Sequence, residues 1–375
     1  EKNTNTNYKS FQATVDYSKT FNNVHNIGIL AGYSWEEESA RDLEGRRDNL
    51  PSNEYPYLTV GSPDNQTNAG GGYDWVIQSF FGRAQYNYAE RYLGEVTMRY
   101  DGSSRFPSSS RYAFFPSAAI GWRISEESFF KENEKLSFIN NLKLKASAGI
   151  LGNNNIGNYA YQSVYELGND FNYPLGGSIQ QGAALKTYTD PRLKWETTRT
   201  VNAGIDFSFL NNRLSGNIDF YVSNTSDLLM KRTVPIMNGY NSIMDNVGKT
   251  RNKGVEITLN SVNVETKDFR WGSTFNFALN RDKIVELRGD GNDDLTNKWF
   301  IGEPVKVHYD YNVMGTWQEN DRFELNGHTI AWDAAQKKYL NEDGEEYQKG
   351  AAPGSAKLED RDGDGKITAK DKMII

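Results

Sequence analysis

Residues 201–222 read VNAGIDFSFLNNRLSGNIDFYV, and this stretch decides the fold. Apolar side chains take every second position from Val201 to Phe209, with polar or small residues between them. After the short segment LNNR, the same alternation resumes from Leu214 to Val222. A period of two places apolar side chains on one face of a β-strand and polar side chains on the other. The stretch therefore predicts two antiparallel strands joined by a tight turn.

Similar alternation runs through eight other segments, and most of the predicted strands are long. A strand in a soluble sandwich averages about 5–6 residues, whereas a tilted strand that crosses a membrane needs about 9–11. Strands are predicted at residues 8–19, 24–36, 75–89, 92–103, 112–125, 141–151, 193–209, 213–226, 253–264 and 269–282.

The connections between these strands nearly alternate between short and long. Successive connections of an antiparallel sheet lie at opposite ends, so one end carries tight turns and the other carries large loops. Transmembrane β-barrels have this asymmetry, with short periplasmic turns and long extracellular loops. A soluble β-sandwich with large loops at one end remains the alternative. Short turns are predicted at 20–23, 89–92, 210–213 and 265–268, long loops at 37–74, 152–192 and 227–252, and an exceptional helical segment at 125–141.

Composition narrows the class of protein. The chain has 49 aromatic residues (22 Tyr, 19 Phe and 8 Trp) and 34 Gly, which favours β-structure rich in turns. It has no cysteine, which excludes disulfides and thiolate metal sites. Residues 283–375 hold 19 acidic and 13 basic residues, whereas residues 1–282 are almost balanced. This charge excludes the basic footprint of a nucleic-acid-binding protein and makes the last quarter suited to cations.

Residues 92–130, YLGEVTMRYDGSSRFPSSSRYAFFPSAAIGWRISEESFF, resemble outer-membrane TonB-dependent transporters of the SusC/RagA type. In that family a strand ends in a run like Arg99 to Phe106, and the next strand carries Phe-Pro-Ser and then Gly-Trp-Arg. Matching segments follow in the family's order at 141–161, 193–229, 246–260, 301–318 and 353–375, so the resemblance covers nearly the whole chain.

The resemblance implies an all-β fold: an antiparallel transmembrane barrel, of which residues 1–375 supply about ten strands. Family barrels have about 22 strands, so an internal barrel fragment is expected, without the plug domain and the C-terminal strands. Residues 283–375 are expected to form a long acidic extracellular region. The implied function is nutrient import across the outer membrane, of oligosaccharide or peptide. The implied partners are a SusD-like surface lipoprotein, TonB acting through the plug, and outer-membrane lipid.

The segment DRDGDGKITAKD, residues 360–371, has the spacing of a calcium loop. Asp360, Asp362 and Asp364 stand at positions one, three and five, and Gly365 stands at position six, where such a loop turns sharply. The other expected ligands are the Lys366 carbonyl, Thr368 and Asp371. Pro353-Gly354 lies just upstream and no helices flank the loop, so a structural Ca²⁺ is expected rather than a sensor. A solvated Asp/Gly turn is the alternative.

No constellation for covalent chemistry is found. The three histidines (His25, His308 and His328) are scattered, and none lies near the Asp101 and Ser103 of DGSSRF, which is better interpreted as a tight loop. We therefore expect a transporter with no catalytic residues. The alternative function is a soluble extracellular calcium-dependent β-domain that binds carbohydrate or acts as an adhesin.

Overall fold

The structure is a computed structural model that describes the chain except residues 53, 168–170, 234–236, 238–241 and 320. The described residues divide into two compact units, Glu1–Gly291 and Asn292–Ile375. No helix in the described ranges is long and apolar enough to cross a membrane, a finding that concerns helices alone.

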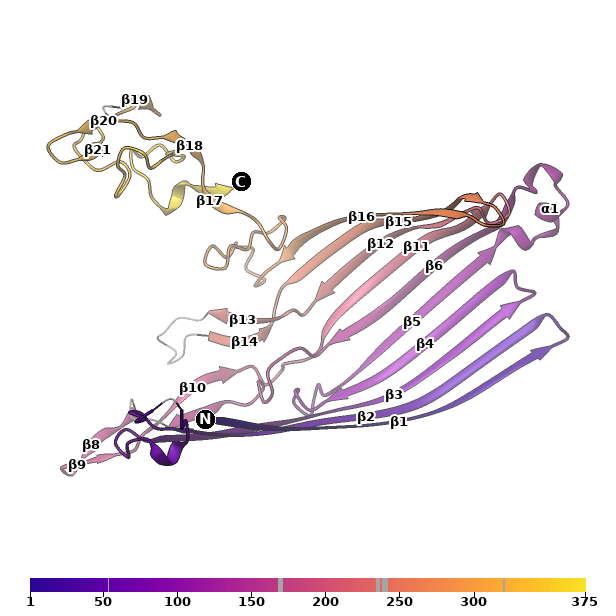
Figure 1. The fold of residues 1–375 in the computed structure, drawn as a ribbon, viewed down its shortest axis with the longest axis horizontal. Helices are drawn as coiled ribbons and strands as arrows, with labels where there is room; N and C mark the ends of the chain where they lie inside the picture. Colours follow the sequence, from indigo (N-terminus) through magenta and orange to yellow (C-terminus); the bar gives the residue numbers. More distant parts are fainter. Residues whose placement is uncertain (53, 168–170, 234–236, 238–241, 320) are drawn as a thin grey trace. The chain divides into compact units, whose positions relative to one another are not determined.

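The first unit is built on one ten-stranded antiparallel sheet, seen in Figure 1 as long strands side by side. The strands follow one another in chain order, and β1 and β16 each have a single neighbour in the sheet. The sheet is open, as expected for part of a larger barrel. Its strands are β1 Lys2–Phe21, β2 His25–Arg46, β3 Thr67–Tyr88, β4 Tyr92–Ser103, β5 Tyr112–Arg123, β6 Ile139–Asn153, β11 Glu196–Phe209, β12 Leu214–Ser226, β15 Lys249–Glu265 and β16 Arg270–Glu286.

All ten predicted strands are present, but the prediction of a loop over 37–74 is wrong at both ends. Strands β2 and β3 stay paired from Glu37 opposite Val76 to Arg46 opposite Thr67, which leaves residues 47–66 as the connection. This part of the ladder has polar side chains on both faces, so it lacks the alternation that marks a strand in the sequence. Backbone hydrogen bonds continue there without an apolar face.

Left-handed backbone closes the short connections at residues 22–24 and 210–213. Asn22 and Asn23 have φ of 47° and 57°, and Asn211 and Asn212 have φ of 56° and 63°. Asparagine tolerates this left-handed conformation, which matches the twist of the flanking strands. The predicted helical segment 125–141 is helical only in part, as η2 Ile124–Glu126, α1 Ser128–Lys131 and η3 Glu134–Leu136.

The predicted long loops contain strands of their own. Segment 152–192 forms β7 Val164–Leu167, β8 Tyr173–Leu175, β9 Ser178–Gln180 and β10 Ala183–Thr189, and segment 227–252 forms β13 Leu229–Thr233 and β14 Ser242–Asn246. Strands β13, β14, β10 and β7 make a four-stranded sheet, and β8 pairs with β9. Such short strands carry too few residues for a periodic signal.

Register separates the two faces of the large sheet. Residues directly opposite each other on antiparallel strands share a face. We call the face that carries Val201 the apolar face and the face that carries Thr200 the polar face. One cross-sheet line of the apolar face contains Tyr17, Ile29, Ala84, Val96, Ala118, Ala148, Val201, Val222, Lys253 and Arg281; the neighbouring line of the polar face contains Asp16, Leu30, Arg83, Thr97, Ser117, Gly149, Thr200, Ser223, Asn252 and Asp282.

A small core fastens the loops at the long-loop end of the sheet. Phe106, Phe115, Ile156, Leu193 and Trp195 are buried together. The Trp195 ring lies 5.2 Å from the Phe106 ring and 5.3 Å from the Phe115 ring, and its Nε1 donates to the Arg111 carbonyl at 3.0 Å. These residues come from two loops and from the adjoining end of β5. The core therefore holds loops that are distant in sequence against one another.

The second unit has its own core and only short strands. Trp317 stacks on Tyr339 with ring centroids 3.7 Å apart, and Ile330, Tyr347 and Ala351 complete the buried cluster. Its strands are β17 Tyr309–Tyr311, β18 Val313–Thr316, β19 Arg322–Leu325, β20 His328–Asp333, β21 Lys338–Leu340, β22 Ala356–Leu358 and β23 Lys372–Ile374. They pair as β17 with β23, β18 with β22, and β19 with β20 and β21.

Truncation of the loop core should loosen the long-loop end and leave the sheet intact. Trp195→Ala removes a buried ring and a hydrogen bond, and a buried aromatic deleted in this way costs about 3–5 kcal/mol. We expect trypsin to cleave the full-length protein in membranes after Arg105 or Arg111 much faster in this variant. Trp195→Phe, which keeps a ring, should be intermediate. Equal cleavage of wild type and Trp195→Ala would contradict this role for the core.

Candidate functional site

The polar face of the sheet carries a network of ion pairs. Lys143 Nζ lies 2.7 Å from Asp206 Oδ2, and Lys145 Nζ lies 2.8 Å from Asp206 Oδ1 and 3.0 Å from Asp219 Oδ1. Asn217 also donates to Asp219 at 2.7 Å. Gly204 leaves room for the network, because a Cβ there would clash with the Asp219 carboxylate. Four charged side chains thus neutralise one another on this face.

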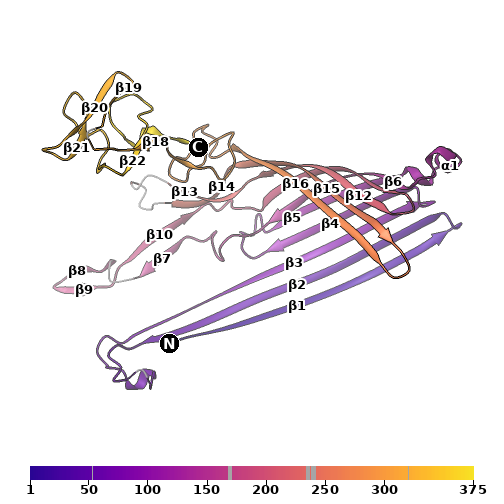
Figure 2. The ribbon, with the colours of Figure 1, turned by 45° about the horizontal axis from the view of Figure 1, so that its top comes forward.

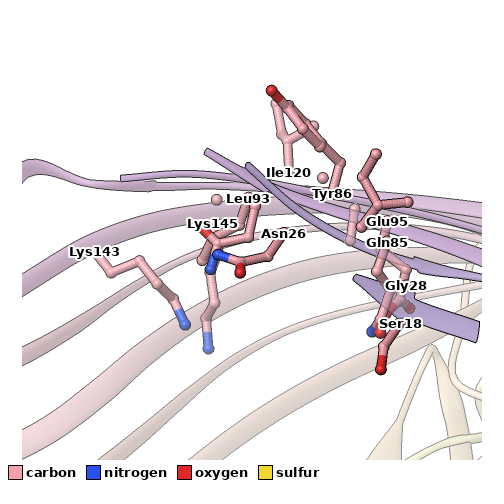
Figure 3. Close-up of a pocket in the computed structure, with 15 residues that line it drawn as sticks. Ser18, Asn26, Gly28, Gln85, Tyr86, Leu93, Glu95, Ile120, Lys143 and Lys145 are labelled. Carbon is pink, nitrogen blue, oxygen red and sulfur yellow. The ribbon is translucent and has the colours of Figure 1, made fainter. Parts of the chain in front are cut away.

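The polar face is also hollowed near the end with the tight turns. Figure 3 shows Lys143 and Lys145 on one side of the sheet and Ile120 and Tyr86 on the other. A groove of about 530 Å³ lies there, lined in part by Gln85, Gly121 and Lys145. Charged and amide side chains line this groove together with apolar ones such as Leu93, so its lining is mixed in character.

The apolar face is exposed over its whole width in the first unit. Val15 is 74% exposed, Ile120 is 68% exposed and Val201 is 61% exposed, on β1, β5 and β11 respectively. Figure 2 shows these strands as parts of one continuous sheet. Soluble proteins rarely expose a contiguous apolar surface of this extent. The face therefore requires a nonaqueous neighbour, which argues against the soluble adhesin alternative.

The acidic loop is a folded turn in which Asp360 is the anchor. Its side chain is 1% exposed, and its two carboxylate oxygens accept from the Gly363 and Gly365 amides at 2.8 and 2.9 Å. Both glycines have positive φ, 74° and 79°, a conformation that glycine adopts without strain. The loop needs Asp360 for its shape, whatever else the carboxylate binds.

The first, third and fifth positions converge as the spacing predicts. One carboxylate oxygen from each of Asp360, Asp362 and Asp364 lies within 4.8 Å of the others. Oxygens about 2.4 Å from a common Ca²⁺ would be separated by up to about this distance, so the three carboxylates fit around one such ion. Asp362 and Asp364 are exposed and accept from nearby backbone amides at 3.3 and 3.0 Å, and Asp362 also lies 3.8 Å from the Lys370 ammonium.

The other three predicted ligands lie outside that group or have other partners. Asp371 is 1% exposed and accepts from the Arg361 and Thr368 amides at 2.8 and 2.7 Å, so it clasps the two ends of the loop. The Thr368 hydroxyl accepts from the Lys370 amide at 3.2 Å, as the N-cap of η6 Ala369–Asp371. The Lys366 ammonium is paired with Glu345, and this pairing does not involve the backbone carbonyl that is the predicted ligand.

Residues that the sequence does not single out hold the loop from outside. His328 Nε2 lies 3.1 Å from the Gly363 carbonyl, and Asn326 donates to the Asp360 carbonyl at 2.6 Å. Asn341 donates to the Gly365 carbonyl at 3.2 Å. Glu342, 2.6 Å from His328 Nδ1, and then the Gly363 carbonyl raise the pKa of His328 above its usual range. No spacing rule connects these residues to the loop, so only the fold reveals them.

The segment DGSSRF forms a hydrogen-bonded loop at the end of β4, and its arginine does not pair with its own aspartate. Arg99, on the strand before it, pairs with Asp101 at 3.0 Å. Arg105 instead reaches the next loop and donates to Asn158 Oδ1 at 2.9 Å. The Ser103 hydroxyl accepts from the Arg105 amide at 3.3 Å and from the Asn154 side chain at 3.1 Å. The segment thus ties two loops together at the end of β4.

Relatives of known class share this architecture. The curated TonB-dependent receptor SusC of Bacteroides thetaiotaomicron is 35% identical over 302 residues, which cover 80% of this chain and 28% of that protein. TonB-dependent receptor P3 of Formosa agariphila is 31% identical and matches 96% of this chain and 35% of its own length. This chain therefore spans about a third of the length of the curated relatives it matches.

A solved structure and a family definition agree with those relatives. The structure of the RagAB peptide transporter superposes on the whole of this chain with a TM-score of 0.79 and 26% sequence identity, and the match covers 38% of that chain. Residues 1–358 match the family described as TonB dependent receptor-like, beta-barrel. The apolar face is accordingly the lipid-facing surface of an outer-membrane barrel wall. This chain belongs to the β-barrel family of TonB-dependent receptors, with SusC and RagA among its relatives.

Proposed function

We propose that this chain is part of the wall and external region of an importer that takes up nutrients across the outer membrane with energy supplied through TonB. The observation that carries the proposal is the sheet with two opposite faces. A wall that is apolar toward lipid and polar toward a lumen encloses an aqueous path for polar cargo. Gated passage along such a path needs no catalytic residue, so we propose a transporter and not an enzyme.

The cargo that fits best is an oligosaccharide or a peptide. The RagAB relative is described as a peptide transporter. The resemblance of residues 92–130 to transporters of the SusC/RagA type implies oligosaccharide as the other class of cargo. Both cargoes are polar and rich in hydrogen-bonding groups, which suits the ion-pair network and the amide side chains of the polar face. By the same resemblance, a SusD-like lipoprotein would cover the external end, and TonB would act through a plug domain.

The acidic loop is proposed to bind one structural Ca²⁺ in the external region. Asp360, Asp362 and Asp364 would supply carboxylate oxygens, and the Lys366 carbonyl, Thr368 and Asp371 would complete the set. Hard Ca²⁺ prefers such oxygen ligands, and the converging carboxylates would repel one another without a cation. Bound Ca²⁺ would order the loop and, through His328 and Asn326, the strand β20 and the turn before it.

Labelling of intact cells tests the orientation of the barrel wall. The chain has no cysteine, so single cysteines can be introduced without background from these residues. A membrane-impermeant maleimide should label Ser108→Cys, in the loop between β4 and β5, on intact cells. Lys267→Cys, in the turn between β15 and β16, should be labelled only after the outer membrane is breached. Labelling of Lys267→Cys but not of Ser108→Cys on intact cells would contradict the proposed topology.

Uptake measurements test the transport itself. Cells that produce the full-length protein should accumulate a fluorescent oligosaccharide or oligopeptide in the periplasm, and deletion of tonB should abolish the accumulation because the path is gated. Cells that lack the transporter gene are the control for leakage. Import of the cargo at the same rate with and without TonB would refute the energised mechanism.

Calcium titration tests the acidic loop. The full-length protein should bind Ca²⁺ in isothermal titration, and Asp362→Ala should weaken binding by about tenfold or more, because it removes a charged ligand without removing an anchor of the loop. At about 100 times the Kd, bound Ca²⁺ would stabilise the folded second unit by about 2.7 kcal/mol. The matched control is Asp343→Asn, an exposed acid of the same unit outside the loop. No uptake of Ca²⁺ by wild type would count against the site.

A further inference from the structure

The apolar face ends, toward the long loops, in a cluster of positive side chains. Opposed residues on β11, β12, β15 and β16 give two adjacent cross-strand lines, Val201–Val222–Lys253–Arg281 and Arg199–Asn224–Arg251–Lys283. Their five basic residues are all exposed. We call them the basic cluster: Arg199, Arg251, Lys253, Arg281 and Lys283.

The cluster sits at one border of the apolar band. On β16 the side chains of this face run from Trp271 through Phe275, Phe277 and Leu279 before they reach Arg281. From Trp271 to Leu279 is about the length that a tilted strand needs to cross the hydrocarbon layer. Trp271 lies at the turn end, so the basic cluster lies at the level of the headgroups on the long-loop side.

Among the described residues, the cluster carries positive charge without carboxylate partners. In the part of the chain that the structure describes, none of its five side chains forms an ion pair with a carboxylate, and Arg251 donates instead to the Asn224 side-chain oxygen at 2.7 Å. Charges on the same face of β1, β2 and β3 behave differently. There Lys9 pairs with Glu37 at 3.9 Å, and Arg41 pairs with Asp74 at 3.4 Å. The excess of positive charge is thus a property of one side of the sheet.

A groove leads from the cluster into the apolar band. It has a volume of about 450 Å³, and Lys253 and Arg281 stand at its edge. Its wall is apolar, with Val201, Phe220 and Leu279 around the small side chain of Ala203. A chain of methylene groups fits the wall, and an anionic headgroup fits the edge.

We infer that the basic cluster and this groove bind a phosphate-bearing glycolipid of the outer leaflet. This inference rests on the topology proposed above, in which the long-loop end faces the cell exterior. The outer leaflet of this membrane is built of glycolipids that carry phosphate on their sugars. Phosphate lies between the cations, with Lys253 and Arg281 nearest the acyl chain and Arg199, Arg251 and Lys283 above them. Each cation near a charged headgroup contributes favourably, and guanidinium groups bind phosphate in a bidentate fashion. This site is separate from the lumen, so it is independent of the cargo.

Native mass spectrometry of the delipidated full-length transporter tests the site. Purified phosphorylated lipopolysaccharide should bind wild type and should bind Lys253→Gln/Arg281→Gln about 30-fold more weakly, because two of the five cations are lost. The matched control is Lys9→Gln/Arg41→Gln, which removes the same charge from the same face of β1 and β2 and should bind as wild type does. The charge-keeping variant Lys253→Arg/Arg281→Lys should also bind normally, which separates loss of charge from loss of folding.

Competing ligands fix the identity of the lipid. Enzymatically dephosphorylated lipopolysaccharide should bind weakly, and inorganic phosphate at millimolar concentration should fail to displace the intact glycolipid, because it cannot use the groove. Equal binding of phosphorylated and dephosphorylated glycolipid would overturn the proposal. So would equal affinity for phosphatidylglycerol, which would make the cluster a site for any anionic lipid, or unchanged binding by Lys253→Gln/Arg281→Gln.

Discussion

The hydrogen-bonded ladder between neighbouring strands is the constraint on which the rest of this structure depends. Hydrocarbon offers no water to an amide or a carbonyl, so a chain that crosses it with strands must pair these groups along a sheet. Pairing then fixes which face each side chain takes. Val201 and Val222 face lipid because Thr200 and Ser223 face the lumen, and a slip of one residue would exchange them.

This constraint explains which parts of the fold can be predicted from the sequence. Where one face meets lipid and the other meets water, as in residues 201–222, apolar and polar side chains alternate along the sequence. Beyond the hydrocarbon layer both faces are wet, so the paired residues 37–46 of β2 look like a loop in the sequence although their backbone ladder continues. The short strands β7 to β10 are held by neighbouring loops and have no periodic signal of their own.

The candidate sites likewise contain some residues that the sequence predicts and others that only the fold reveals. The carboxylates of Asp360, Asp362 and Asp364 come from one turn, so their spacing alone predicts that they converge. His328, Asn326 and Asn341 support that turn from separate segments, and no local pattern could reveal them. The basic cluster could not be predicted from the sequence, because no local pattern distinguishes any of its five residues. Only the register of β11, β15 and β16 brings them together.

The chain order of the strands in the large sheet has a consequence for how such a wall is made. From β2 to β16, each strand of this sheet pairs with the sheet strand that precedes it in the sequence. Every amide or carbonyl left unpaired in hydrocarbon costs several kcal/mol. A strand added in sequence order finds its partner already in place, so few of these groups are unpaired at any step. The same backbone groups that hold the finished sheet together therefore favour its assembly in the order of the sequence.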